Sequence, residues 1–138
     1  MLALTRHPSL SINQAAASLW IGLFRHDQLS TDPDVRSCIG PWLEIARLKL
    51  ILPSAEEQDK DPFAQLDFDS DEELITFRLR FRSEMLEACR LASALAPQLA
   101  FDCASRWLIT VLDASLTTAA PVAEWEALPY FLDSVTGN

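Results

Sequence analysis

Residues 71–95 read DEELITFRLRFRSEMLEACRLASAL, and this stretch decides which fold the chain can adopt. One apolar face recurs at helical spacing and consists of Leu74, Phe77, Phe81, Met85, Ala88 and Ala92. A second apolar face consists of Ile75, Leu79, Leu86 and Cys89. A helix with two apolar faces must be packed between neighbouring helices. The stretch therefore predicts a central helix over residues 70–95 in an all-α protein.

Four further helices are predicted on either side of this segment. Their expected ranges are 11–27, 32–52, 97–116 and 121–135, with an acidic loop over 53–69. Asp32 as N-cap and Pro33 at the first helical position mark the start of the second helix. Pro41 lies inside that helix and is expected to kink it. Pro97 ends the long central helix and opens the next one.

Five antiparallel helices with short turns fit two architectures, a closed bundle or a stack of helix pairs called an α-solenoid. The broad apolar faces favour the stack. The third helix begins about 60 residues after the first, and the acidic loop accounts for about 17 of these, which fits one solenoid repeat of about 40–47 residues. We therefore expect residues 1–138 to form a single α-solenoid segment of about two and a half repeats.

Composition narrows the class of protein. The chain has 138 residues and a formal net charge of −9. The acids are concentrated in residues 53–73, which hold nine acidic residues and one basic residue, Lys60. This acidic segment does not suit contact with a phosphate backbone, which requires Lys and Arg. Cys38, Cys89 and Cys103 are odd in number and lie among apolar residues, so reduced, buried thiols are expected. No signal peptide or membrane span is expected.

Residues 67–73 read DFDSDEE and raise the question of a calcium site. Asp67, Asp69 and Asp71 match positions one, three and five of an EF-hand loop. However, Glu72 stands where the loop needs glycine, and Arg78 stands where it needs a bidentate glutamate. Calcium binding is therefore not expected, and no metal or cofactor site is predicted.

A helix cap explains part of the same motif. Ser70 and Glu73 form a capping box, and Asp71 and Glu72 suit the positive end of the helix dipole. The other acids leave three alternatives open: a solvated linker, a contact with a basic partner, and phosphorylation of Ser70. The candidate partner-binding residues in this segment are Asp67, Asp69, Asp71, Glu72 and Glu73.

No pattern indicates an enzyme. His7 and His26 lie about one helix length apart, and neither has a nucleophile motif nearby. The chain also has no phosphate-binding glycine motif. The four tryptophans lie on apolar helix faces, where packing between helices is the expected role. The alternative, stacking on nucleic-acid bases, would need exposed rings.

Several strings in order resemble one protein family. They are HPSL, LWIGLFRH, LSTDP, LDFDSDEELITF, EACRLA, SRWLITVL and EWEALPYFLDSV. Together they closely resemble an internal stretch of the exportins of the karyopherin-β family that carry microRNA precursors. The resemblance runs nearly end to end and is weakest over 53–65. It implies an internal fragment of a much longer protein, built of HEAT repeats.

The resemblance also implies a function. Such exportins are non-catalytic scaffolds that shuttle between nucleus and cytoplasm. They bind Ran-GTP, nuclear pore proteins and double-stranded RNA with a short overhang, such as microRNA precursors. By this pattern the first, third and fifth helices form the outer row, while the second and fourth face the partners. The inner positions that could reach a partner are Arg36, Glu44, Arg47, Lys49, Asp102, Arg106 and Asp113. Arg78 and Arg82 are interpreted as surface charge that balances nearby acids.

A second hypothesis comes from another class of protein. The chain could be a stand-alone acidic helical adaptor that binds a basic protein through its loop. The two hypotheses differ in the surfaces they predict. A solenoid fragment should expose apolar side chains where further repeats would pack, and should self-associate through them.

Overall fold

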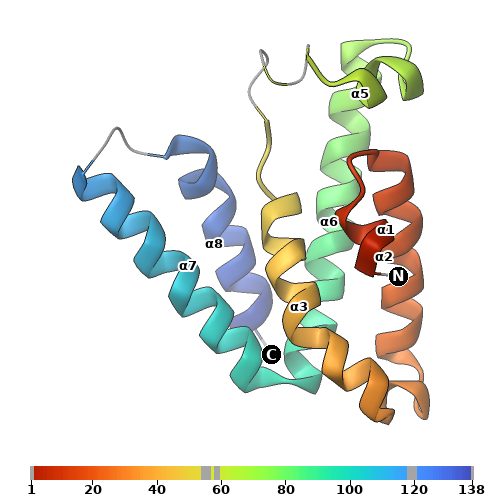
Figure 1. Ribbon diagram of the computed structural model, residues 1–138, viewed down its shortest axis with the longest axis vertical. Coiled ribbons are helices and arrows are strands. Elements are labelled where there is room, and N and C mark those ends of the chain that lie inside the picture. Colours follow the sequence, from red (N-terminus) through yellow and green to blue (C-terminus); the bar gives the residue numbers. More distant parts are fainter. Residues whose placement is uncertain (1, 54–56, 58–59, 118–120, 138) are drawn as a thin grey trace.

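The computed structural model describes residues 2–53, 57, 60–117 and 121–137, and these residues contain helices and no strand (Figure 1). The all-α prediction is therefore confirmed. The elements are α1 (Leu2–Arg6), α2 (Leu10–Arg25), the 3-10 helix η1 (Leu29–Thr31), α3 (Pro33–Lys49), α5 (Pro62–Asp67), α6 (Asp71–Leu95), α7 (Pro97–Thr117) and α8 (Val122–Thr136).

Two short helices differ from the sequence prediction. The range 53–69 was expected to be a loop, yet α5 occupies six of its residues. Its start signal is local: Asp61 is the N-cap, and its Oδ1 accepts hydrogen bonds from the backbone of Phe63 at 3.0 Å and Ala64 at 3.4 Å. Pro62 follows at a position that suits proline. The other addition is α1, whose Thr5 hydroxyl accepts a hydrogen bond from Trp20 Nε1 at 3.0 Å.

The long helix α6 is central, as its two apolar faces predicted. It contacts α2, α3, α7 and α8. Along one row α2 packs on α6 and α6 packs on α8, while α3 packs on α7 in front of them (Figure 1). The prediction of a solenoid of stacked helix pairs is compatible with this arrangement and stays a prediction. The assignment to HEAT repeats stays a prediction.

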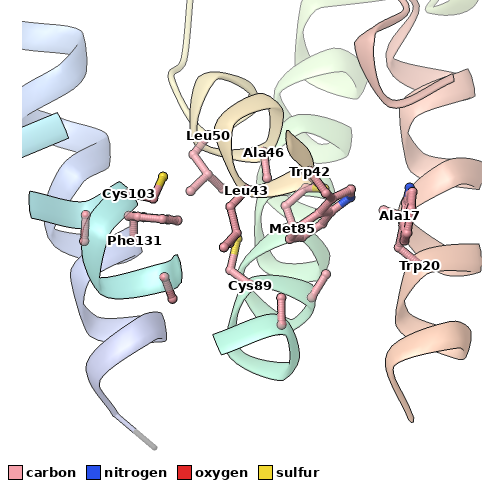
Figure 2. Packing of buried hydrophobic residues seen from close by; sticks show 14 of the residues in the cluster. Ala17, Trp20, Trp42, Leu43, Ala46, Leu50, Met85, Cys89, Cys103 and Phe131 are labelled. Atoms are coloured by element: carbon pink, nitrogen blue, oxygen red, sulfur yellow. The ribbon is translucent and has the colours of Figure 1, made fainter. Parts of the chain in front are cut away.

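One continuous core runs through both rows (Figure 2). Trp42 and Leu43 of α3 meet Met85 and Cys89 of α6, and all four are buried. Aromatic contacts extend the core in both directions. The largest rings are Trp20, Phe24 and Trp42 on one side and Trp107 and Phe131 on the other. Three of the four tryptophans are fully buried and Trp125 is partly buried, so packing between helices is their role.

The cysteines follow the expected pattern only in part. All three are free; Cys89 and Cys103 are buried, but Cys38 is only partly covered. Burial raises the pKa of the Cys89 thiol well above its usual range, so it packs as an apolar side chain.

An apolar stripe on α7 faces solvent. It consists of Phe101, Ile109, Leu112 and Leu116, which lie on one side of the helix and are all exposed. None of the helices in the described ranges is long and apolar enough to cross a membrane.

Candidate functional site

The candidate site is the face where α3 and α7 lie side by side, because Glu44, Arg47 and Arg106 of the predicted inner row meet there. Glu44 of α3 is its centre. Its Oε2 accepts a hydrogen bond from Arg47 Nε at 3.0 Å, and its Oε1 lies 2.7 Å from Arg106 Nη2 on α7. One carboxylate thus ties the two helices together and holds two guanidinium groups at the surface.

The electrostatics of Glu44 follow from these neighbours. Burial alone would raise the pKa of the Glu44 carboxyl. The hydrogen bond from Arg47 and the positive charges of Arg106 and Arg47 outweigh burial and lower that pKa below its usual value. Beneath this group, burial and then the Glu44 charge raise the pKa of the Cys103 thiol to about 12. The raised pKa favours the neutral thiol of Cys103, which packs as a small apolar side chain.

Arg47 makes a second contact that orients it. Its Cζ lies 5.6 Å from the centroid of the Trp107 ring, within the range of a cation–π interaction. Trp107 in turn donates from Nε1 to Glu124 Oε1 at 3.2 Å on α8. The guanidinium of Arg47 is therefore fixed from two sides, whereas the side chain of Arg106 is 66% exposed. Arg106 is the more accessible of the two for a partner.

Lys49 lies at the end of α3 beside a second group of charges. Its Nζ donates to the backbone carbonyl of His7 at 3.0 Å. Asp61 and Arg78 are its charged neighbours, and Asp61 Oδ2 lies 3.9 Å from Arg78 Nη2. Burial lowers the pKa values of both Lys49 and Arg78, with partial compensation from Asp61. Lys49 therefore supports the turn after α1 as well as contributing positive charge.

Arg36 is held by contacts within the chain. Its Nε donates to the Ser30 carbonyl at 2.9 Å, and its Nη1 donates to the Leu95 carbonyl at 2.6 Å. It thereby satisfies a carbonyl at the end of α6, where helices leave acceptors without partners. The observed role of Arg36 is to bind the carbonyl at the end of α6. Its role as a partner-binding residue stays a prediction.

The acidic motif is largely committed to the start of α6. Ser70 is the N-cap and its Oγ accepts from the Glu73 backbone at 3.1 Å. Glu73 Oε2 accepts from the Asp69 backbone at 3.3 Å, one residue earlier than a capping box places it. Asp67 Oδ2 accepts from Ser9 Oγ at 3.0 Å, which ties α5 to the start of α2.

The other acids of the motif, Asp71 and Glu72, lie exposed in the first turn of α6. They stay candidates for contact with a basic partner. Glu56 and Asp59 of the predicted acidic loop lie outside the described residues. Within those residues, no group of three His, Cys, Asp or Glu side chains could hold a metal ion.

The interpretation of Arg82 as surface charge was wrong. This side chain is buried, and its Nε and Nη2 donate to the Leu50 carbonyl at 3.1 and 2.8 Å. The same guanidinium forms two hydrogen bonds to Glu126 of α8, at 2.8 and 2.6 Å. Its Cζ also lies 4.7 Å from the centroid of the Tyr130 ring. Arg82 therefore joins α3, α6 and α8.

A sequence signal for Arg82 was present. Position 82 lies seven residues after Ile75 and seven before Cys89, on the second apolar face of the helix. A charged side chain on an apolar face must find partners, because burying it unpaired is costly. The partners Leu50 and Glu126 are far away in the sequence, so their identity needed the structure. Arg78, the other half of the predicted surface pair, is half-buried against Asp61.

Comparisons with known proteins agree on one family. A family model described as Exportin-5 matches residues 1–138. The chain is similar to Exportin-5 of Mus musculus, with 31% identity, and to Exportin-5 of Homo sapiens, with 32% identity. Each alignment covers 97% of this chain. The chain spans 13% of the length of these curated relatives.

Proposed function

We propose, from the premise that this chain belongs to the Exportin-5 family, that it forms one segment of a nuclear export receptor. The observation that carries the proposal is the family match over all 138 residues, together with the two relatives named Exportin-5. The family resemblance seen in the strings of sequence is confirmed by these matches.

The proposed mechanism is non-covalent. Stacked helices would present a surface on α3 and α7, and binding of Ran-GTP and cargo would bias the curvature of the longer solenoid. The cargo would be double-stranded RNA with a short overhang, such as microRNA precursors, with their associated proteins. Nuclear pore proteins would be contacted during passage between nucleus and cytoplasm.

Two features of the structure support this proposal. The stripe of Phe101, Ile109, Leu112 and Leu116 leaves an apolar face on α7 where a further helix could pack, as a stack of repeats requires. The face of α3 and α7 also carries the guanidinium groups of Arg47 and Arg106, suited to phosphate or carboxylate groups of a partner.

The test uses the longer protein that contains this chain. It should bind a short-overhang RNA hairpin when Ran is loaded with GTP, and bind it much more weakly when Ran is loaded with GDP. Equal binding in the two nucleotide states would contradict Ran-GTP dependence. Absence of binding in both states would contradict RNA as the cargo.

A matched pair of variants tests the proposed face. Arg106 of α7 is 66% exposed and lies 2.7 Å from a glutamate, Glu44. Arg25 of α2 is 58% exposed and lies 2.8 Å from Glu87. If the face of α3 and α7 contacts phosphates, Arg106→Glu should weaken binding of the RNA hairpin in the presence of Ran-GTP. It should also reduce the salt dependence of that binding, while Arg25→Glu should do neither. Equal effects of the two variants would show that this face has no special role.

A further inference from the structure

A groove on α3 combines an apolar floor with a basic rim. It has a volume of about 530 Å³ and lies between α1 and the solvent-facing side of α3. Its apolar residues are Pro41, Ile45 and Leu48, and its basic residues are Arg6, Arg47 and Lys49. Leu48, in the last turn of α3, is 54% exposed. A leucine exposed to this degree beside a proline offers a place for an apolar side chain from outside.

The charge of the groove differs from the charge of the chain. The whole chain carries a net charge of −9, yet the groove holds three basic side chains and one acid, Glu44. Glu44 is already occupied, because Arg47 and Arg106 both contact it. Lys49 donates to a backbone carbonyl and shares its acidic neighbour Asp61 with Arg78, and no ion pair within the described part of the chain neutralises Arg6. The groove therefore has a local excess of positive charge.

We propose that this groove binds an acidic peptide segment with an apolar anchor. The anchor would rest on Pro41 and Leu48, and carboxylates of the peptide would meet Arg6 and Lys49. At about 0.15 M salt the Debye length is about 8 Å, so the nearest charges decide the contact rather than the net charge of the chain. An apolar floor beneath basic residues suits an amphipathic peptide, which buries one face and pairs charges at its edge.

A nucleic-acid backbone fits this groove less well. Phosphates would satisfy the basic rim but would leave Leu48 and Pro41 uncovered, so the apolar floor would contribute nothing. The inference goes beyond the proposed function, because binding at this groove needs neither Ran nor RNA. Its failure would leave the export proposal standing, and the reverse is also true.

The test measures fluorescence anisotropy of labelled peptides added to the 138-residue chain. The probe is a short helical peptide with leucines on one face and glutamates on the other. A second peptide replaces the glutamates with lysines, and a third replaces the leucines with serines. We expect the first peptide to bind at least about tenfold more tightly than either of the others. Binding of the lysine peptide with equal or greater affinity would overturn the proposal.

Matched variants locate the binding. Arg6→Glu and Leu48→Ser should each weaken binding of the acidic peptide by about tenfold. The controls are Arg80→Glu, an exposed arginine on α6, and Leu79→Ser, whose leucine is 52% exposed. The controls should bind as the unmodified chain does, and all four variants should keep its helical circular dichroism. An equal loss in variants and controls, or no binding by the unmodified chain, would overturn the proposal.

Two other occupants of the groove are distinguished in the same series. A labelled RNA duplex that binds in place of the acidic peptide, and is lost in Arg6→Glu, would assign the groove to nucleic acid. A dimer in sedimentation that becomes a monomer in Leu48→Ser would assign it to a second copy of the chain. Either result would overturn the acidic-peptide proposal. The proposal is supported if the RNA duplex does not displace the acidic peptide and the chain does not dimerise through the groove.

Discussion

The start and the middle of α6 carry the same second apolar face, but that face has different surroundings in the two regions. In its first turns, Ile75 and Leu79 are each 52% exposed. Farther along the same face, Leu86 is partly buried and Cys89 is fully buried among the neighbouring helices. In the first turns the second face stays half exposed, although Leu74 of the first face is already buried there. A helical pattern thus shows which faces are apolar, and the neighbours decide which of those faces are covered.

The largest expected effect comes from the buried middle of α6. Met85→Ala removes a side chain that is 1% exposed and should lower the free energy of unfolding by about 2–5 kcal/mol. Leu79→Ala, six residues earlier, should change it by about 0.5 kcal/mol or less, because its side chain is half exposed. Urea unfolding followed by circular dichroism measures both. Equal losses of unfolding free energy in the two variants would mean that Leu79 is covered in solution. The start and the middle of α6 would then not differ.

A second effect concerns the charged contact inside the same helix. Arg82→Ala leaves the Leu50 carbonyl and Glu126 without their donor. Breaking a fully buried ion pair costs about 3–5 kcal/mol, but Glu126 is 42% exposed and water can replace part of the contact. We therefore expect a loss of about 2 kcal/mol. Arg80→Ala, on the exposed side of α6, is the control and should change stability by less than about 0.5 kcal/mol.

The double change Arg82→Ala with Glu126→Gln sharpens this test. If the pair is coupled as its two hydrogen bonds indicate, the double variant should be more stable than the sum of the single losses predicts. Simple additivity would show that Arg82 acts through its other contacts, the Leu50 carbonyl and the Tyr130 ring.

A third effect isolates the start of α6. Ser70→Ala removes the acceptor for the Glu73 backbone and should cost about 1 kcal/mol. Ser83→Ala is the control, because its Oγ bonds to the Leu79 carbonyl in the middle of the helix, where such bonds add little. Hydrogen exchange should rise in the first turn of α6 in Ser70→Ala and stay unchanged around Met85. Faster exchange along the whole helix would contradict the idea that the start of α6 opens independently of its middle.

Much of the fold could be predicted because its signals are local. Periodic apolar residues, the Asp32–Pro33 start and the Ser70 cap each depend on residues within a few positions. The helix α5 also has a local signal in Asp61 and Pro62, but the acids around it favoured a loop. The contacts of Arg82 and Arg36 could not be predicted in the same way. Their partners Glu126 and Leu95 lie 44 and 59 residues away, and only the packing of the helices brings them together.

The smallest expected effect is the pH dependence of Glu44, which links α3 to α7 outside α6. The folded chain lowers the pKa of this carboxyl, so its ion pairs stabilise the fold fully above the unfolded pKa of about 4.3. This stability is lost as the pH falls through the lower folded pKa.

The carboxylate is about one third exposed and screened by water, so Glu44→Gln should cost about 0.5–1 kcal/mol at pH 7. The difference between this variant and the unmodified chain should shrink as the pH falls below about 4. When Arg106→Ala is present in both proteins, the stability difference caused by Glu44→Gln should be smaller already at pH 7. The reason is that Arg106→Ala removes one of the two charges that favour the ionised form of Glu44. A difference that is constant from pH 7 to pH 3 would mean that Glu44 acts by packing rather than by charge.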